Sequence, residues 1–436
     1  MSDFFPVLPR DVVMDILARL PLNTLVRCTS VCKSWYSLLI NPSFITKHLN
    51  LNLNRSPHLR IVRSYSDSNS REHYSVRYDD DQIFPEYAKP HFPLKSHCSH
   101  YFRIIGVCNG LICLSDDQFT YVNELFLWNP AIRKMMPLPR VRVTFQSHGP
   151  FQHTIGFGFD PLTHDYKVIR IVHLVYDFYN PPKTEIDIFS LSTGTWRNIS
   201  HVPFPLPDII INERAPQAFL KGAAHWIASS KSSRSYAFGF LILSFHMAHD
   251  QFGQIKLPHN ITEDANPYLM AGIGFRVAKF QESLALMHLT GTYRDHTCCI
   301  WVMKEYGVAE SWTKQFNIDI TGSFSSVAGF TRKGQLLLQN SAGYLVAHHP
   351  QPERLTDLLI HGSTNSAYLH TSFYADAYTE SLVLLGNRFS ETTGTSPQES
   401  SPGAEDVKGG SGAEENRFVT GVKNENEETS EDGGEL

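Results

Sequence analysis

The sequence predicts a multidomain α+β protein with a small helical N-terminal domain, an all-β propeller of about six blades and a disordered acidic tail. Three observations predict this. Residues 8–49 contain short amphipathic helices separated by prolines, residues 58–386 repeat one pattern of strands and turns, and the residues after 386 include almost no apolar side chains. At 436 residues the chain has room for two or three domains. We divide it into a helical domain (1–50), a linker with the first strands (51–99), the propeller (100–386) and the tail (387–436).

The opening stretch, LPRDVVMDILARLPLNTLVRCTSVCKSWYSLLINPSFITKHL, reads as three short helices. Pro9 suits a first helical turn, and Asp11 places negative charge at the positive end of the helix dipole. Pro21 ends the first helix, a second starts near Leu22, and a third short piece is broken at Asn41-Pro42 before Phe44 and His48. The first helix carries apolar residues at i, i+3, i+4 and i+7, which are Val13, Ile16, Leu17 and Leu20.

A segment of about 40 residues rarely buries this many large apolar side chains by itself. Spacing alone leaves two interpretations open: a helical cap on the main domain, or a docking module whose apolar side chains contact a partner. Cys28 and Cys32 lie at i and i+4, but no matching pair of His or Cys residues is near them. We therefore expect buried thiols there and no metal site.

The order Leu-Pro, Ile-Leu, Leu-Pro, Leu, Val-Cys-Lys-Ser-Trp and Asn-Pro, followed by Phe, resembles the F-box family over its whole length. The resemblance implies docking onto a Skp-type adaptor and, through it, onto a cullin-RING ubiquitin ligase. Many plant members have a basic residue followed by Ser where this chain has Asn23-Thr24, which removes no apolar contact. The positions that match the family's adaptor contacts are Leu8, Pro9, Ile16, Leu17, Pro21, Leu25, Val31, Cys32 and Trp35.

The body repeats a hairpin pattern five times, with turns near residues 130, 193, 249, 307 and 351. A period of about 45–60 residues lies in the range of kelch-type propeller blades. A β-sandwich is the alternative, but five copies of one pattern favour units that bury their faces against each other around a ring. Strand-like runs at 59–65, 73–79, 372–378 and 381–386 predict one further blade shared by both ends of the body. Six blades fit best, although seven or eight also accommodate the spacing.

The body also resembles the plant F-box-associated domain, from about residue 100 to 386. The runs that carry this resemblance include CNGLICLSD, LWNPAIRKMMPLP, GFGFDPLTHDYKVIRIV and FLKGAAHWIA. The segment 92–94, the Ile-Leu-Ser-Phe run and the Trp-Val-Met run are similar to S-locus F-box proteins and their relatives. This similarity implies a role in pollen self-incompatibility, with a style ribonuclease as the target. Paralogues that bind other targets share the same motifs.

Charge and cysteine content exclude several classes of protein. From Gly386 onward there are 12 acidic and 4 basic residues, so the rest of the chain carries a net charge of +3 with no basic stripe of a nucleic-acid binder. No apolar run is long enough for a transmembrane helix, and the N-terminus lacks the features of a secretory signal. The seven cysteines have no framework spacing, so we expect a reduced compartment, the cytoplasm or the nucleus.

Motifs of catalysis are missing from the sequence. There is no phosphate-binding loop, no His-Glu-x-x-His pair and no Gly-x-Ser-x-Gly elbow, so we expect no enzyme, no cofactor and no metal. Gly156 and Gly158 alternate with aromatic residues and predict a strand packed closely against its neighbour. The carboxylates of Glu185 and Asp187 lie on one face of a predicted strand without any sign of acid–base chemistry.

Three functions remain open from the sequence: a substrate-recognition subunit of an SCF-type ligase, a ligand- or glycan-binding propeller without a ligase, and a propeller oxidoreductase. Target contacts are expected on four long connections rich in Tyr, Phe, Arg and Pro, residues 141–153, 175–184, 203–216 and 259–268. The tail is too polar to offset the entropy of ordering and is expected to be disordered.

Overall fold

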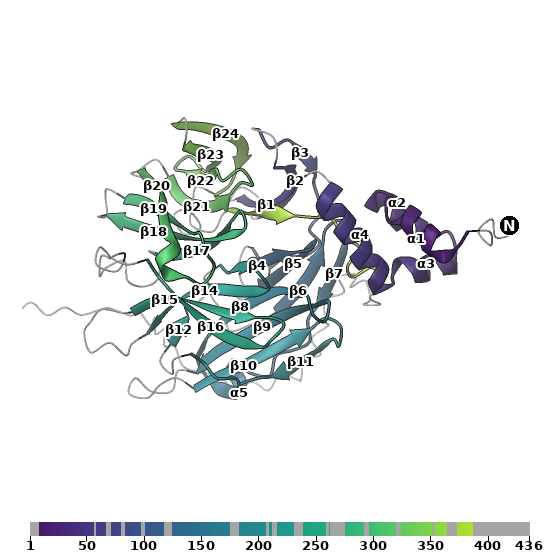
Figure 1. Ribbon diagram of the computed structural model, residues 1–436, viewed down its shortest axis with the longest axis horizontal. Helices are drawn as coiled ribbons and strands as arrows, with labels where there is room; N and C mark the ends of the chain where they lie inside the picture. The colour runs from purple at the N-terminus through teal and green to yellow at the C-terminus, as the bar shows by residue number, and fades with distance from the viewer. Residues whose placement is uncertain are drawn as a thin grey trace, which may run out of the picture. The chain divides into compact units, whose positions relative to one another are not determined.

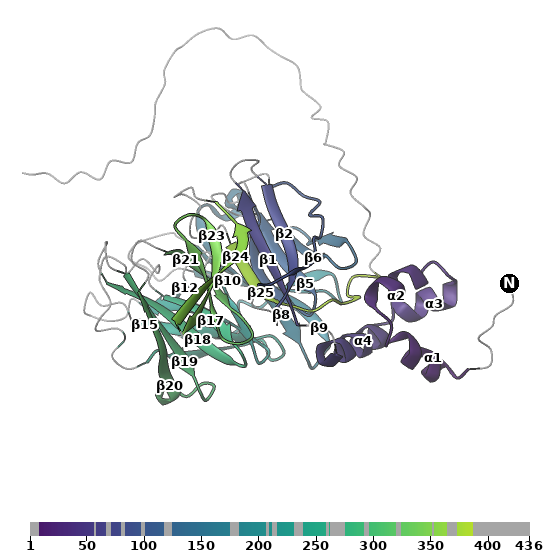
Figure 2. The same ribbon diagram turned by 90° about the horizontal axis from the view of Figure 1, so that it is seen from above.

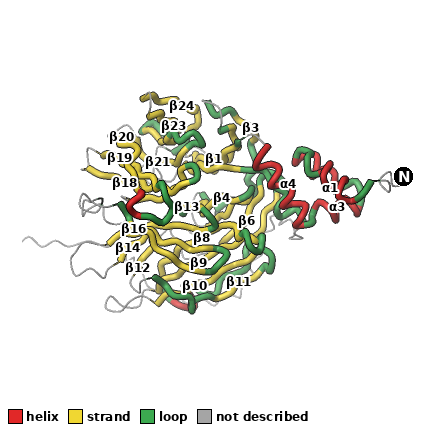
Figure 3. Tube along the Cα trace, viewed as in Figure 1, coloured by secondary structure: helices red, strands yellow, loops and turns green. Residues whose placement is uncertain are grey.

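The computed structural model describes residues 8–55, 58–66, 71–79, 83–96, 101–116, 124–174, 183–205, 209–211, 216–230, 239–258, 261, 275–291, 296–319, 324–350, 353–363 and 373–386. Helices occupy the N-terminal part and strands most of the remainder (Figure 3). The predicted tail lies outside the described residues.

The helical region contains four helices among the described residues, one more than the sequence suggested. They are α1 (Arg10–Leu17), α2 (Leu22–Cys28), α3 (Lys33–Leu39) and α4 (Pro42–Arg55). The Asn41-Pro42 pair that ends α3 also begins α4. Asn41 Oδ1 accepts hydrogen bonds from the Ser43 amide at 2.9 Å and from its hydroxyl at 2.6 Å. Because Pro42 needs no N–H in the first helical turn, the predicted break is also a helix start.

Six antiparallel sheets make up the described part of the body, which confirms the predicted propeller and its blade number. Figure 1 shows them following one another around the body. From the innermost strand outward, blade A is β25 (Phe373–Tyr378), β1 (Leu59–Ser66), β2 (Arg71–Tyr78) and β3 (Glu86–Ala88), and blade B is β4 (Arg103–Cys108), β5 (Leu111–Asp116), β6 (Glu124–Asn129) and β7 (Lys134–Pro137). Blade C is β8 (Phe151–Asp160), β9 (Asp165–Leu174), β10 (Lys183–Ser190) and β11 (Thr195–Asn198).

Blade D has five strands, because two short strands, β12 (Ile209–Ile211) and β13 (Ala218–Leu220), both pair with β14 (Ala223–Ser230). Its outer strands are β15 (Gly239–His246) and β16 (Gln251–Lys256). Blade E is β17 (Phe275–Phe280), β18 (Ser283–Gly291), β19 (His296–Met303) and β20 (Trp312–Asp319), and blade F is β21 (Phe324–Phe330), β22 (Leu336–Asn340), β23 (Tyr344–Pro350) and β24 (Glu353–His361). A short helix, α5 (Phe145–His148), lies between β7 and β8, and a 3-10 turn (Ala309–Ser311) precedes β20.

The ring is closed by strands from both ends of the body, as predicted. The last strand, β25, pairs antiparallel with β1 from Leu59↔Tyr378 to Ser64↔Phe373, and it contacts β4 and β21 of the blades on either side. Figure 2 shows β25 beside β1. The prediction of a strand at 381–386 is wrong. Ser381–Leu384 are buried, and residues 383–386 form a turn in which Leu384 has φ +74°, a conformation that no extended strand contains.

Close packing between blades explains the alternation of glycine and aromatic residues in β8. A Cβ at Gly156 would lie 2.4 Å from the Trp226 ring, and one at Gly158 would lie 2.1 Å from the Phe219 ring. Trp226 is fully buried, and its indole N–H donates to the Ile155 carbonyl at 3.3 Å. The predicted close approach of this strand to a neighbour is therefore confirmed, and the neighbour is blade D.

Strand direction divides the connections between two ends of the propeller. In an antiparallel blade the first-to-second and third-to-fourth turns lie at one end, and the other connections lie at the opposite end. The first end carries tight turns such as Asn109-Gly110 and Leu191–Gly194, together with the residues that enter β1 and leave β25. We call it the entry face. The opposite end, which carries the longer connections, is called the loop face.

Buried histidines make the stability of the fold depend on pH. His225 is fully buried, with Nδ1 3.0 Å from the Ala218 carbonyl and Nε2 2.7 Å from the Tyr306 hydroxyl. Both contacts suit a neutral ring that donates from Nδ1 and accepts at Nε2, and burial lowers the pKa of His225 to about 4. The unfolded chain therefore binds more protons between pH 6.5 and 4. Stability should be complete above pH 6.5 and fall by about 3 kcal/mol from this group as the pH drops to 4.

Urea denaturation at pH 7 and pH 4.5 measures this effect. The loss of stability between the two pH values should be smaller in His225→Gln than in the wild type, and unchanged in a control at the exposed His201. Burial raises the pKa of Glu72 to about 7, which favours the folded state as the pH falls from 7 to 4.5 and so opposes the histidine effect. The comparison between variants removes that contribution. An equal pH dependence in His225→Gln and the wild type would contradict the assignment.

Candidate functional site

The helical region exposes apolar side chains that a self-contained domain would bury. Val12 and Ile16 are 42% and 48% exposed and lie one turn apart on α1, and Leu8 just before the helix is 42% exposed. Val31, in the turn between α2 and α3, is 64% exposed. Exposed large apolar side chains gathered on one small domain are typical of an interaction site. We call these four residues, Leu8, Val12, Ile16 and Val31, the apolar helical surface.

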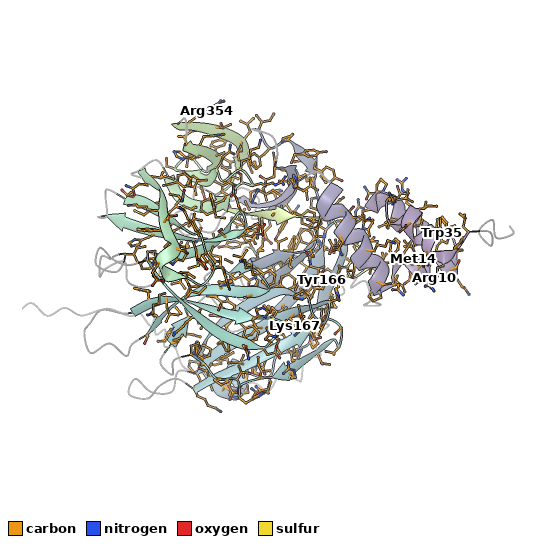
Figure 4. All side chains as sticks on the ribbon, viewed as in Figure 1. Arg10, Met14, Trp35, Tyr166, Lys167 and Arg354 are labelled. Atoms are coloured by element: carbon orange, nitrogen blue, oxygen red, sulfur yellow. The ribbon has the colours of Figure 1, made fainter. Side chains whose placement is uncertain are left out.

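The predicted adaptor contacts fall into two groups. Leu8, Pro9, Ile16, Pro21, Val31 and Cys32 are exposed, and Trp35 is half-buried. Leu17 and Leu25 are 3% and 0% exposed and belong to the core that the helices share. Buried side chains of this kind can hold the exposed contact residues in place. They cannot contact a partner unless the helices rearrange. Figure 4 marks Trp35 on α3 and Arg10 and Met14 on α1.

Sequence reasoning missed Val12 and grouped Ile16 with the wrong face of the helix. The predicted stripe placed Ile16 beside Val13 and Leu17, but Leu17 is buried while Ile16 is exposed. The signal in the sequence was the i, i+4 spacing of Val12 and Ile16, which defines a second apolar face. A helix with two apolar faces can pack on its own domain and still present a surface to a partner.

A buried segment after β25 joins the helices to the propeller. Leu382, Val383 and Leu384 share one hydrophobic core with Leu17, Leu25, Leu39 and Phe44 of the helices and with Leu111 and Leu127 of blade B. Asn129 at the end of β6 holds this segment, because its Nδ2 donates to the carbonyls of Ser381 at 2.9 Å and Val383 at 2.8 Å. Its Oδ1 accepts from the Ala131 amide at 3.1 Å.

Gly110, in the turn between β4 and β5, makes room for the same segment. It has φ +84°, and a Cβ there would lie 2.5 Å from Ser381 Oγ and 2.6 Å from the Thr379 carbonyl. Both the backbone conformation and the close approach require glycine at this position. The helical region is therefore attached at the entry face by packing and hydrogen bonds as well as by the chain itself.

The described strands that flank the four connections predicted to contact a target have the joined ends at the loop face. Residues 141–153, 203–216 and 259–268 follow the outermost strands of blades B, C and D, and 175–184 connects the second and third strands of blade C. Much of residues 175–184, 203–216 and 259–268 lies outside the described residues. Strand polarity alone places their ends together, opposite the end where the helical region is attached.

The described connection 141–150 is anchored to blade C by charge. Arg142 Nη2 lies 2.6 Å from Glu185 Oε2, and Arg142 Nε lies 3.7 Å from Asp187 Oδ1. Hydrogen bonds and ion pairs, first from Lys183 and then from Arg142, hold the pKa of Glu185 down to about 2. Arg142 thus pairs with both carboxylates, and α5, three residues further along the chain, has Phe145 46% exposed. These ion pairs tie the connection to blade C.

A cavity of about 900 Å³ opens between the helical region and the entry face. It is lined by the α1–α2 turn, α4 and the innermost strands, and a buried ion pair, Arg60 Nη2 to Asp79 Oδ2 at 2.7 Å, lies in its wall. Burial raises the pKa of Asp376, another lining residue, which accepts a hydrogen bond from Tyr374 at 3.0 Å. The lining combines acids and bases without one dominant charge.

The described part of the chain contains no group of three His, Cys, Asp or Glu side chains arranged to hold a metal ion. None of the helices described is long and apolar enough to cross a membrane.

A helical docking module attached to one end of a closed six-bladed propeller defines a class of recognition protein, and comparison with known proteins identifies it. The F-box associated beta propeller domain matches residues 65–381, and an F-box-like domain matches residues 5–51. The chain belongs to the family of F-box proteins with an F-box-associated β-propeller.

Its relatives include plant proteins of similar length. F-box protein At3g07870 of Arabidopsis thaliana is 26% identical over 411 residues, which cover 84% of this chain and 90% of that protein. F-box/kelch-repeat protein At3g23880 of the same plant is 26% identical over 332 residues, covering 71% and 79%. Among solved structures, an oligogalacturonate lyase in complex with manganese has a TM-score of 0.35 at 8% identity over 65% of this chain and 70% of that one, too low to support any argument.

Proposed function

We propose that this protein is the substrate-recognition subunit of an SCF-type ubiquitin ligase. The apolar helical surface docks onto a Skp-type adaptor, and the loop face of the propeller binds a target protein for ubiquitination and degradation. The single observation that carries the proposal is that the helical surface and the long connections lie on opposite ends of one closed ring. A bound target would then face away from the adaptor and remain accessible.

The protein's part in catalysis would be positional. A target held on the propeller gains a high effective concentration near a ubiquitin-carrying enzyme, and positioning of this kind contributes several kcal/mol to a bimolecular reaction. The helical region shares its core with blade B and with the segment Ser381–Leu385. Because that joint is packed and hydrogen-bonded, the target would be held at a defined position relative to the adaptor.

Capture of a purified Skp-type adaptor by the full chain tests the proposal. Ile16→Glu combined with Val31→Glu should abolish capture, because two exposed side chains change and their carboxylates would be desolvated in the interface. The melting temperature should remain close to that of the wild type. Leu162→Glu, at a 66% exposed position in the β8–β9 turn, is the matched control and should capture normally.

Substitution of Leu17 cannot provide the same test. Leu17 is 3% exposed within the helical core, so Leu17→Glu would lose capture by unfolding the helices. If the wild-type chain captures no adaptor, or if the Ile16/Val31 double variant captures it normally, the ligase role is wrong.

A ligand- or glycan-binding propeller that acts without a ligase is the second candidate, and the cavity of about 900 Å³ favours it. Such a protein would bind its ligand as well in the Ile16/Val31 double variant as in the wild type, and would capture no adaptor. Screening a small-molecule and glycan library by thermal shift, with both proteins, separates the two roles.

The target and the compartment are finer proposals. We propose a style ribonuclease in pollen self-incompatibility as one target, supported by the resemblance of three short runs to S-locus F-box proteins; failure of purified style ribonucleases to bind the full chain would exclude it. We propose the cytoplasm or nucleus as the location, supported by seven cysteines whose spacing fits no disulfide framework. Imaging of a fluorescent fusion in plant cells tests that location.

A further inference from the structure

Leu359 has both a positive φ and a highly exposed apolar side chain. No other large apolar residue of the described chain has both. Among the described residues, three apolar residues other than glycine have positive φ: Phe84 at 49°, Leu384 at 74° and Leu359 at 55°. Phe84 and Leu384 are 1% and 5% exposed, so burial of the side chain offsets the strained backbone. Leu359 is 82% exposed, the highest value among the exposed large hydrophobic residues of the described chain.

A bulge in β24 explains the backbone conformation of Leu359 but not the residue. The register with β23 shifts between Leu345 and Val346, so that Leu358 and Leu359 are extra residues between the pairs with Asp357 and Ile360. Leu358 and Ile360, on either side of Leu359, are both buried in a core shared by blades F and A. A position with positive φ normally favours Gly or Asn. A leucine at this position is strained and also exposes a large apolar side chain to water, so it does not stabilise the fold. We therefore infer that it serves binding.

The position of Leu359 links it to the loop face. It lies near the end of β24, an outermost strand whose chain leaves at that face. Tyr344, which begins β23 at the same face, is 37% exposed, and its ring meets the His361 ring edge to face at 4.9 Å. Leu355, on the same strand, is 53% exposed. Figure 4 shows Arg354, the neighbour of Leu355, at the outer border of the ribbon.

β24 is also longer than the outermost strands of blades A, B and C. The outermost strands β3, β7 and β11 have three or four residues each, and β7 ends on Pro137. Short strands and proline are devices that prevent pairing with another chain. β24 has nine residues and pairs on one side alone, with β23, among the strands described. Its exposed row is Leu355, Asp357, Leu359 and His361.

We propose that Leu355, Leu359 and Tyr344 form a docking site for an extended segment of the target protein, which lies along the free edge of β24 and places a large apolar side chain on Leu359. The segment is uncharged or basic, because the exposed carboxylate of Asp357 lies between the two leucines and would repel an acidic one. This mode of recognition combines main-chain pairing at a strand edge with apolar side-chain contacts. The proposal rests on the role of the propeller as a target receptor.

Two substitutions at residue 359 separate binding from folding. Leu359→Asn removes the exposed apolar side chain and introduces a residue that tolerates positive φ, so the melting temperature should be unchanged or higher. Leu359→Met keeps a large apolar side chain and should keep binding. Leu162→Asn, at another exposed leucine on the entry face, is the control.

The probe is a random-peptide phage library selected on the wild-type full chain in complex with its adaptor. Selected peptides should carry a large apolar residue flanked by neutral or basic ones. Their affinity should fall about tenfold or more, which is about 1.4 kcal/mol, for Leu359→Asn and remain for Leu359→Met and Leu162→Asn. Adaptor capture should be the same for all four proteins.

Several results would overturn the docking site. A lower melting temperature of Leu359→Asn would assign the leucine to the fold. Selected peptides that bind Leu359→Asn as well as the wild type, or a selection that enriches no peptide, would leave the edge without this role. A wild-type dimer that Leu359→Asn dissociates would assign the edge to a second copy of the chain. Because adaptor capture is measured separately, its failure would refute the ligase role and leave the peptide result readable on the free chain.

Discussion

Deletion of residues 373–386 should prevent the propeller from folding. These residues supply the innermost strand of blade A and the segment that packs under the helices, and their large buried side chains include Phe373, Tyr378, Leu382 and Leu384. Burial of one such side chain contributes about 1.5–3 kcal/mol. The sum reaches the whole free energy of unfolding of a typical domain, about 5–15 kcal/mol. The deletion also exposes the edge of β1, which is a template for aggregation, and removes the packing of β25 against β4 and β21.

Soluble yield, circular dichroism and thermal melting measure this effect. The deleted chain should be insoluble or lack a cooperative transition. The control deletes residues 389–436, which lie outside the described residues, and should melt like the full chain. A soluble 373–386 deletion with the wild-type melting temperature would contradict closure of the ring by β25.

Asn129→Ala should destabilise the joint between the propeller and the helices by about 3 kcal/mol. The Asn129 side chain is fully buried and makes three hydrogen bonds to backbone groups of Ser381, Val383 and Ala131. Alanine leaves these buried groups without a partner, and each such loss costs about 1–3 kcal/mol before the structure relaxes. The segment 381–385 should then exchange its amide hydrogens faster, as should α2 to α4, which pack on it.

Urea denaturation and hydrogen exchange of the full chain test this prediction. Asn198→Ala is the matched control. Asn198 also donates to a backbone carbonyl, that of Ile186 at 3.2 Å, but it is exposed at the edge of blade C and water can replace its contacts. The control should cost less than about 1 kcal/mol. Equal effects of the two substitutions would show that Asn129 contributes no more than a surface amide.

These two predictions concern the same structural principle. The ring is closed by a strand that arrives last in the sequence, and the residues after that strand fix the first helices of the chain. The docking module and the target-binding ring are therefore coupled in stability. A substitution that weakens blade closure should also weaken adaptor capture without touching the apolar helical surface.

Several parts of the architecture could be predicted from local patterns. The helices α1 to α3 follow from prolines and apolar spacing, and the six blades follow from five repeated hairpins and the strand-like runs at both ends. Trp128 of blade B packs between blades, with its ring centroid 4.9 Å from that of Tyr74 of blade A. The glycines of β8 correctly predicted close packing against a neighbouring strand, although the sequence did not identify that strand.

Other features were wrong or invisible because they depend on contacts between residues far apart in the chain. Residues 381–386 have the apolar composition of a strand, but Asn129, more than 250 positions earlier, holds their carbonyls in a turn. The face of Ile16 was misassigned because two apolar faces on one short helix cannot be ranked by spacing. The exposed, strained Leu359 cannot be recognised in the run Leu-Leu-Ile without the register of its neighbour.

The sequence by itself determined the classes of element, the repeat and the family, because periodicity, turn residues and motifs act over a few neighbouring positions. The tertiary structure alone decided which apolar residues are buried and which are presented, as at Leu17 and Ile16. It also decided that β25 and Ser381–Leu385 bind the two ends of the folded unit together. The physical reason is that burial and hydrogen bonding depend on surroundings supplied by distant parts of the chain, which no local pattern records.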